Sequence, residues 1–528
     1  MTKLTKATFI VAASFAINKI LAIVRQLIIA RQFGLSAELD VFNVANNVPD
    51  MLYALISGGA LAVAIIPVLS EVLTTQSRES AWKVFSRVAN ISFLASIVLS
   101  LGVVLFAEEL VTNPLGIAPG FNTEQQELVV ELMRLNLIAT LIFSMAGLLI
   151  AGLQANQHFL LPAIAPILYN VGQIYGAIVL APQEGYRIGN WQLPAFGMGV
   201  YGIVYGVIIG SALFFLILIP GLVKYQFKWV PRLDFNHPDV RKILRMLAPR
   251  VGSMLFYQLT FIARDNIASY LSTGAPTALT YGWMIQQVPE TLIGTAIGTA
   301  LLPTISEHFA RAEMDKFKEL VERVTQVLIA LALPAAILLA AALPPFLDFA
   351  FGFGAEESAQ LLWVTRAFLV GLVGHSLLEL GSRIFFAQQN AFIPFLGSAL
   401  NLILYISLGS WLARVWDAPG VGLADSLAFT AQAVFLLVIF QIQAAKKRGE
   451  KPLLTSTIWE AFTGSPAVKR SLLRGLVGAC LGAAFIWLFL TFRPLPVPSI
   501  ISGLLAAVVG LALSVPFIWK EVRILLRL

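Results

Sequence analysis

Long runs of apolar residues recur from one end of this 528-residue chain to the other. A helical run of about 20 such residues, rising about 1.5 Å per residue, crosses the roughly 30 Å hydrocarbon core of a bilayer. Only 12% of the residues are charged and 58% are hydrophobic, so the chain has too few charges to cover a soluble protein. The runs also lack the short alternation of a β-barrel. The sequence therefore predicts an all-α polytopic membrane protein, because helices satisfy their own backbone in lipid.

About 14 transmembrane helices are expected from these runs. They lie near residues 7–33, 40–70, 84–107, 128–153, 159–182, 197–222, 248–272, 277–305, 323–348, 361–386, 391–413, 419–443, 472–492 and 497–520. The first run carries charged residues and no clear small-residue cleavage site, so we expect it to be a retained span. The single cysteine, Cys480, excludes an internal disulfide and a cysteine-based zinc site.

Basic residues are concentrated in alternate connectors. The connectors at 223–247 and 444–471 are rich in Lys and Arg, whereas the loops on the opposite side carry acidic residues such as Glu108 and Glu356. Lys and Arg are typical of cytoplasmic loops, so both termini are predicted in the cytoplasm and the number of spans is even. This placement explains the net charge of +7 without nucleic acid as a partner.

Two six-span units resemble one another in sequence. Pro67-Val-Leu-Ser-Glu71 corresponds to Pro303-Thr-Ile-Ser-Glu307, and Gln157 to Pro162 corresponds to Gln389 to Pro394. Six is an even number, so the units share one orientation, which predicts a pseudo-twofold axis along the membrane normal and a cavity between the halves. The predicted parts are two six-helix pseudo-repeats, residues 1–230 and 231–450, and a cytoplasmic linker with a C-terminal helix pair, residues 451–528.

Ionisable groups inside the predicted spans are the candidates for function, because each is costly in lipid. Asn18 and Arg25 are seven residues apart and share one helical face, and the repeat places Arg264 near the counterpart of Arg25. Arginine binds phosphate with two hydrogen bonds and stays charged, so two arginines converging on a cavity suit an anionic head group. The candidate substrate-binding residues are Lys19, Arg25, Asp40, Asn43, Asn47, Asp50, Arg250, Arg264 and Glu290.

The alternative is that these charges only pin helices together. Arg25 would then pair with Asp40 or Asp50, and Arg264 with Asp265 or Glu290. Glu379 and Arg383, four residues apart in one span, are interpreted mainly as such an intrahelical pair. The histidines lack metal-ligand spacing, and no nucleotide-binding or hydrolase motif occurs, so we expect a transporter with no catalytic residues, not an enzyme or an ATP-driven pump.

Several of these motifs resemble the MurJ/MviN family of lipid II flippases. The first span reads NKILAIVRQ from Asn18 and ARQFG from Ala30, and the second carries LDVFNVA from Leu39 and VPD from Val48. The end of the eighth span, GTALLPTISE from Gly298, fits the same pattern. The similarity extends over spans 1–12, and the arrangement of six, six and two spans matches the fourteen helices of the family.

The resemblance implies an alternating-access exporter of the bacterial inner membrane that turns an undecaprenyl-pyrophosphate-linked peptidoglycan precursor outward. Arg25 matches a functional arginine of the family, Lys19 matches another in charge, and Asp40 matches its acidic position in helix 2. Helices 13 and 14 are expected to form a groove for the lipid tail. No cofactor is implied, and the energy source is open between the membrane potential and a monovalent ion. The expected partners are the lipid-linked substrate, membrane lipids and cell-wall synthesis proteins.

Some positions depart from the family pattern. Gln26 replaces a frequent aspartate, Tyr53-Ala54 stands at a frequent arginine pair, and Met284 stands near an arginine position. In span 11, Asn401 is a weak sodium candidate because Tyr405 replaces an aspartate. We hypothesise that Arg264 and Arg250 supply the missing charge. The alternative functions are an exporter of another polyprenyl-linked glycan or amphiphile, and an inactive relative that acts as a scaffold.

Overall fold

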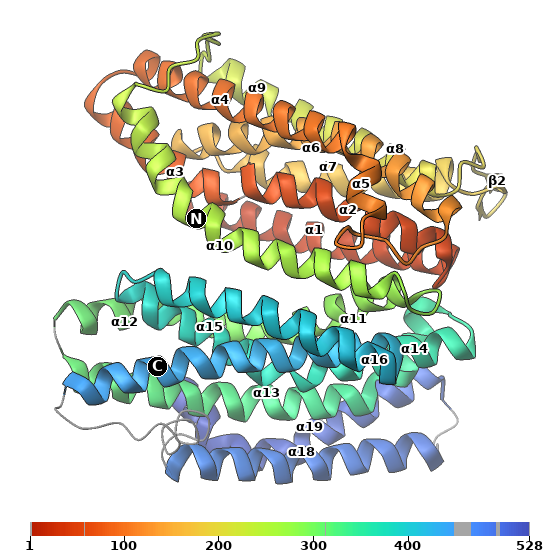
Figure 1. The fold of residues 1–528 in the computed structure, drawn as a ribbon. Helices are drawn as coiled ribbons and strands as arrows, with labels where there is room; N and C mark the ends of the chain where they lie inside the picture. Colours follow the sequence, from red (N-terminus) through yellow and green to blue (C-terminus); the bar gives the residue numbers. More distant parts are fainter. Residues whose placement is uncertain (1–2, 57–58, 312, 448–465, 493–496, 527–528) are drawn as a thin grey trace. The chain divides into compact units, whose positions relative to one another are not determined.

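The chain folds almost wholly into helices, as a computed structural model of residues 3–56, 59–311, 313–447, 466–492 and 497–526 shows (Figure 1). These helices form two compact units, Met1–Thr273 and Gly274–Leu528. Within the described ranges, ten helices are long and apolar enough to cross a membrane, or up to eleven if one bent pair is a single span. The predicted all-α polytopic fold is therefore confirmed, and the number of fourteen spans stays a prediction.

Unit 1 is a bundle of antiparallel helices. Its elements are α1 (Lys3–Phe33), α2 (Ala37–Ile56), α3 (Gly59–Thr75), α4 (Arg78–Leu105), α5 (Ala107–Thr112), α6 (Thr123–Ala155), α7 (Leu160–Tyr175), the π-helix η1 (Gly176–Leu180), a hairpin of β1 (Arg187–Ile188) and β2 (Trp191–Gln192), α8 (Val200–Leu216), α9 (Ile219–Lys224) and α10 (Pro238–Ala268). The long helix α6 packs against α2, α3, α4 and α8. Gly172 and Gly210 bring α7 and α8 together, since a Cβ atom on Gly172 would lie 2.4 Å from the Gly210 Cα.

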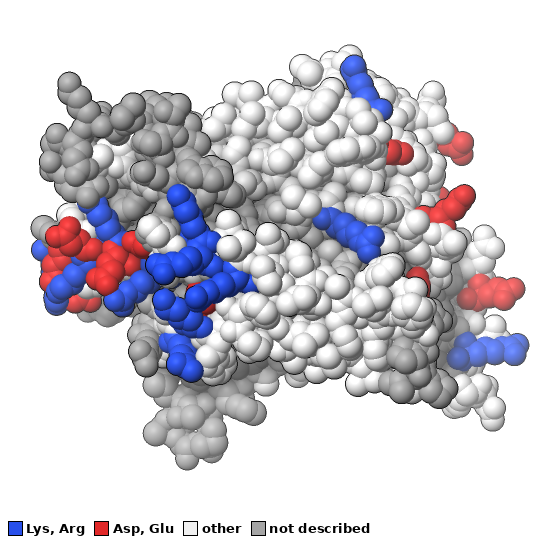
Figure 2. Space-filling view, turned by 90° about the horizontal axis from the view of Figure 1, so that it is seen from below, with Lys and Arg blue, Asp and Glu red and all other residues white. Residues whose placement is uncertain are grey.

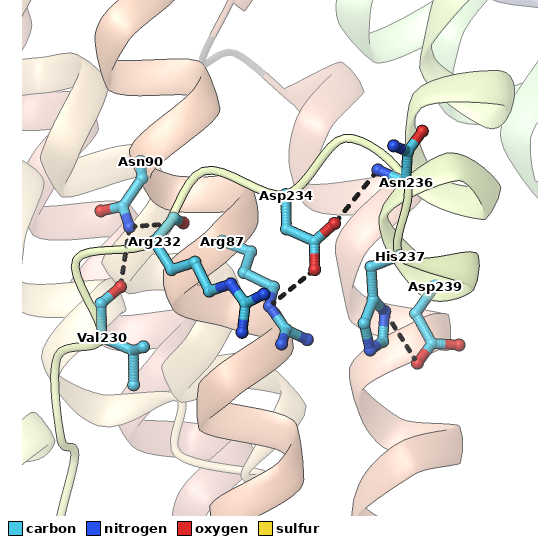
Figure 3. A network of polar contacts seen from close by, with 8 residues as sticks. All are labelled: Arg87, Asn90, Val230, Arg232, Asp234, Asn236, His237 and Asp239. Carbon is cyan, nitrogen blue, oxygen red and sulfur yellow. Dashed lines mark hydrogen bonds and ion pairs between the residues drawn. The ribbon is translucent and has the colours of Figure 1, made fainter.

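The basic connector between α9 and α10 is fastened to α4 (Figure 3). The Asn90 side chain donates to the backbone oxygens of Val230 and Arg232 at 2.8 and 3.1 Å, and Arg87 lies 3.6 Å from the carboxylate of Asp234. These contacts hold the entry of α10 to unit 1, and α10 then packs on α2, α3 and α4. The compact units thus divide after residue 273, whereas the sequence repeat was placed at 230/231; the repeat boundary stays a prediction.

Unit 2 contains the second set of spans and the C-terminal pair. Its elements are α11 (Ala275–Glu290), the π-helix η2 (Thr291–Thr295), α12 (Ala296–Ala310), α13 (Met314–Phe351), α14 (Ala355–Val370), α15 (Leu372–Ala387), α16 (Phe392–Lys447), α18 (Pro466–Phe492) and α19 (Ser499–Leu525). The element α16 consists of two helices that fold back on each other. The backbone at Asp417 is left-handed with φ 54°, and a Cβ atom on Gly420 would lie 2.2 Å from the Leu412 carbonyl oxygen. The predicted spans 11 and 12 are therefore both present in α16.

The two helices of the C-terminal pair, α18 and α19, pack on each other through small residues, and both contact α13. A Cβ atom on Gly482 would lie 2.5 Å from the Gly510 carbonyl oxygen, and the Ser514 hydroxyl donates to the Gly478 oxygen at 2.8 Å. Close approach through Gly and Ser is typical of helices packed in lipid. On the face shown in Figure 2, Lys and Arg gather toward one end and much of the middle is uncharged, as expected for a hydrophobic belt.

Equivalent turns in the two units share an unusual backbone. Gln157 and Gln389 are both left-handed, with φ of 57° and 56°, although neither is glycine. The next residues, His158 and Asn390, both donate their backbone N–H to the carbonyl oxygen five residues back, at 2.9 Å. Two identical turns at matched sequence positions support the internal repeat.

Candidate functional site

Arg25 lies on α1 in a polar contact with α7. Its Nη1 donates to the Asn170 side-chain oxygen at 3.1 Å, and the Asn170 amide donates to the Asn18 oxygen at 2.8 Å and to the Pro166 carbonyl at 3.0 Å. Asn18 and Arg25 therefore share one helical face, as the spacing predicted, and Asn170 joins them. The hydrogen bond to Asn170 fixes the position of Arg25, and the residue is only half-buried, so part of it stays accessible.

Asp50 on α2 completes the polar group around Arg25. Its carboxylate is close enough to Arg25 for electrostatic attraction. Beside it, the ring centroids of Tyr53 and Phe143 lie 5.5 Å apart, and those of Phe143 and Tyr169 lie 4.9 Å apart. We call Asn18, Arg25, Asp50, Tyr53, Tyr169 and Asn170 the Arg25 cluster. It combines one cation, one carboxylate, two amides and two phenols.

Arg264 has different neighbours. Its Nε and Nη2 donate to the Asp265 carboxylate at 3.1 and 3.0 Å, and its guanidinium carbon lies 5.1 Å from the Phe261 ring centroid. The Asn47 amide of α2 donates to the other oxygen of Asp265. Arg264 and Asp265 are only 7% and 1% exposed. The pair therefore ties α10 to α2, as expected if Arg264 serves to hold helices together. The convergence of Arg264 with Arg25 on a cavity stays a prediction.

The other predicted residues of unit 1 lie on α1, α2 and α10. Asp40 is buried in the first turn of α2, where a carboxylate is stabilised by the helix dipole. Asn43 is half-buried on the same helix, and Lys19 is exposed on α1. The side chain of Arg250 lies outside the described residues. Their assignment as substrate-binding residues stays a prediction.

Glu290 lies in unit 2, where α11 passes into the π-helix η2. Thr295 donates to its carboxylate at 3.0 Å, and His375 and Glu379 of α15 are near enough to act on it electrostatically. A single π-helical turn widens the helix and is frequent at functional sites. Asn401 and Tyr405 are both buried in α16, and the sodium assignment of Asn401 stays a prediction.

Sequence reasoning missed a buried pair beside Glu290. His375 Nε2 lies 3.0 Å from the Asp425 carboxylate, and the His375 ring stacks on Phe429 with centroids 4.3 Å apart. The spacing of the histidines gave no sign of this contact, and Asp425 is not among the predicted residues, although a charged residue in an apolar run is itself the signal. One turn from His375, the predicted pair of Glu379 and Arg383 is confirmed at 2.8 Å. Across the described residues, no three His, Cys, Asp or Glu side chains converge as a metal site requires.

Comparison with known proteins places this architecture. The sequence profile described as "Lipid II flippase MurJ" matches residues 29–496. A relative named Lipid II flippase MurJ from Burkholderia cenocepacia is 28% identical over 420 residues, which are 78% of each chain.

Solved structures agree on the fold. One titled "Lipid II flippase MurJ, inward closed conformation" matches 97% of this chain and 100% of its own with a TM-score of 0.73 at 19% identity. A multidrug resistance MATE family transporter of the MOP superfamily, inward-facing, matches 81% of this chain and 96% of its own with a TM-score of 0.66 at 16% identity. The chain is a multi-pass bacterial membrane protein, and because the profile covers most of its length, it belongs to the Lipid II flippase MurJ family.

Proposed function

We propose that this protein moves a lipid-linked peptidoglycan precursor, lipid II, from the inner to the outer leaflet by alternating access. The observation that carries this proposal is the family match over residues 29–496, together with a MurJ fold that accounts for 97% of the chain. The relatives that bear the name lipid II flippase supply the substrate class. The function is transport rather than an enzymatic reaction.

The Arg25 cluster supports an anionic head group as cargo. A guanidinium offers paired donors that match a pyrophosphate and keeps its charge at any physiological pH. Asn170 fixes the Arg25 fork at 3.1 Å, and the neighbouring amide and phenol groups can bind sugar hydroxyls. Arg264, by contrast, is buried and already bound to Asp265, so a role in positioning α10 against α2 fits it better.

The direction of transport rests on the predicted topology. The basic connectors predict that both termini lie in the cytoplasm, where the precursor is made, and the inner membrane is then the site of action. The membrane potential or a monovalent-ion gradient would drive the cycle, with Asn401 as the weak candidate for an ion ligand. The substrate and membrane lipids are the partners, with cell-wall synthesis proteins as further candidates.

Depletion of a bacterial host's own flippase tests the proposal. We expect the wild-type chain to restore lipid II in the outer leaflet, measured by a probe that reaches only that leaflet. Arg25→Ala should lower the restored amount at least about tenfold, because it removes the charged donor for pyrophosphate. Arg25→Lys keeps the charge but lacks the paired guanidinium donors, so the amount of lipid II that it restores should lie between that of the wild type and that of Arg25→Ala. Absence of rescue by a wild-type chain shown to be in the membrane would exclude lipid II.

Another polyprenyl-linked glycan is the second candidate, favoured by one observation. The position of the frequent arginine pair is held by Tyr53 and Ala54, and Tyr53 packs on Phe143 rather than supplying charge. Aromatic rings stack on sugars, so this change suits a different glycan. Failure to expose lipid II, with export of another lipid-linked glycan that still depends on Arg25, would establish this alternative. Loss of both activities would leave the scaffold interpretation.

A further inference from the structure

Two arginines occupy the same place in the two units. The helix α6 spans residues 123–155, and α14 with α15 spans residues 355–387, so each end is displaced by 232 residues. Arg134 and Arg366 are separated by the same 232 residues, as are the left-handed Gln157 and Gln389. Arg134 and Arg366 are therefore equivalent positions of the repeat.

Both arginines bind an equivalent backbone oxygen. Arg134 Nε donates to the Val104 oxygen at 3.3 Å, and Arg366 Nε donates to the Ala340 oxygen at 3.0 Å. These oxygens correspond, because α4 begins at residue 78 and α13 at residue 314, and both pairs differ by 236. Each carbonyl lies where the regular helix is interrupted. The helix α4 ends at Phe106. In α13 the Ala340 oxygen has no helical N–H to accept from, because residue 344, four positions later, is proline.

The charge partner differs between the units. In unit 1, the Glu108 carboxylate lies 3.6 Å from Arg134. The same shift of 236 places Pro344 where Glu108 would be. Among the residues that the structure describes, Arg366 has no carboxylate within ion-pair distance, and its guanidinium carbon lies 5.1 Å from the Trp363 ring centroid. Unit 2 therefore has the arginine without the neighbouring carboxylate that unit 1 has.

Arg366 borders an apolar cavity of about 460 Å³ between α14 and α16. Its walls come from Trp363, Ala367 and Val370 on α14 and from Trp416, Pro419 and Leu423 on α16. Trp363 and Trp416 are 58% and 54% exposed. The volume lies within the usual range of about 300–1,000 Å³ for small-molecule sites. Tryptophan is enriched where hydrocarbon meets head groups, and a lone cation beside hydrocarbon requires an anion.

We propose that this cavity binds one membrane phospholipid, with the phosphate on the Arg366 guanidinium and an acyl chain against Val370 and Leu423. Nε is held by Ala340, so the two terminal nitrogens are the donors directed to the phosphate. The phosphate replaces the carboxylate that Glu108 supplies in unit 1. The bound lipid belongs to the leaflet at which α14 begins, which the predicted topology makes the outer leaflet. This site is independent of the transported substrate.

Native mass spectrometry of the delipidated full-length protein tests the site. The probes are phosphatidylglycerol, diacylglycerol with the same chains, inorganic phosphate and a polyprenyl phosphate. We expect one tightly retained phosphatidylglycerol and at least about tenfold weaker retention of diacylglycerol. Arg366→Gln should weaken phosphatidylglycerol about tenfold, whereas the matched Arg134→Gln should leave it unchanged.

Two further variants keep Arg366 in place. Val370→Trp fills the cavity and should exclude the lipid, and Pro344→Glu restores the carboxylate of unit 1 and should release the lipid by pairing with Arg366. Monodispersity and thermal unfolding show whether each variant is folded. Equal retention of phosphatidylglycerol and diacylglycerol, or unchanged retention in Arg366→Gln and Val370→Trp, would overturn the proposal. Full competition by inorganic phosphate, or preferential binding of the polyprenyl phosphate, would also overturn it.

Discussion

The fourth span of unit 1 and the equivalent span of unit 2 have the same length and different continuity. The helix α6 is unbroken over 33 residues, whereas α14 and α15 meet at Gly371 with a bend of 41°. Gly371 corresponds to Ala139, Gly374 to Ile142 and His375 to Phe143. All five residues from Gly371 to His375 differ from residues 139–143, and two of the five in the broken span are glycines.

The neighbouring helix α16 supplies hydrogen-bond donors to carbonyl oxygens at the break between α14 and α15. The Ser426 hydroxyl donates to the oxygens of Ala367 and Phe368 at 2.6 and 3.1 Å, which are carbonyls at the end of α14. A Cβ atom on Gly371 would lie 2.6 Å from the Ser426 Cα, so this contact needs the glycine. The comparison teaches that an interrupted span is stable in lipid when another helix supplies its polar partners.

The largest expected effect comes from His375→Phe, which gives span 10 the residue that span 4 has at Phe143. The substitution leaves the buried Asp425 without the ring nitrogen that lies 3.0 Å away. We expect the free energy of unfolding to fall by about 3 kcal/mol, measured by unfolding of the purified protein in detergent.

A double-mutant cycle is the control for this prediction. Asp425→Leu together with His375→Phe removes both polar groups and should recover much of the loss, because two apolar groups of similar shape leave nothing unpaired. If the double variant is no more stable than His375→Phe, the loss comes from packing on Phe429 and not from the pair.

Gly371→Ala should have the next largest effect. Helix propensity alone predicts a gain of about 1 kcal/mol, but the added methyl group meets the backbone of α16. We expect a net loss of about 1–2 kcal/mol in the free energy of unfolding. The control is Gly102→Ala in α4, where nothing lies within 4 Å of the added atom and a small gain is expected. A gain at both glycines would show that α15 and α16 do not need this close contact.

The smallest effect concerns the residues that precede α4 and α13. The Ser77 hydroxyl accepts from the Ser80 N–H, whereas the equivalent Glu313 contacts His308 at 2.8 Å and Lys316 at 3.1 Å. The hydrogen bonds from His308 and then Lys316 hold the pKa of Glu313 below its usual 4.5. Because the pKa of Glu313 is lower in the folded protein than in the unfolded chain, the ionised carboxylate stabilises the fold above about pH 4.5. This stabilisation is lost as the pH falls through the pKa of the folded protein.

Glu313→Gln should therefore lower the Tm slightly at about pH 6 and not at about pH 3. Ser77→Ala is the matched control, because it removes a hydroxyl cap that does not titrate and its effect should be the same at both values. A difference between wild type and Glu313→Gln that persists at the lower pH would contradict the assignment.

Local spacing predicted two relations between side chains correctly. Residues seven or four apart on a helix share a face, and the shared face of Asn18 and Arg25 and the pair of Glu379 and Arg383 followed from that rule. Contacts between distant segments did not follow. His375 and Asp425 are 50 residues apart, and only the packing of α15 on α16 brings them together.

The sequence by itself determined the helical membrane fold and the family. The long apolar runs set the fold, because a backbone in lipid must satisfy its own hydrogen bonds and these runs lack the alternation of a β-barrel, and the local motifs set the family. The tertiary structure alone decided that α10 packs within unit 1, that Arg264 is bound to Asp265 and that Arg366 borders a cavity without its carboxylate. A charge in a span signals that a partner is needed, but which helix provides it depends on how the helices pack.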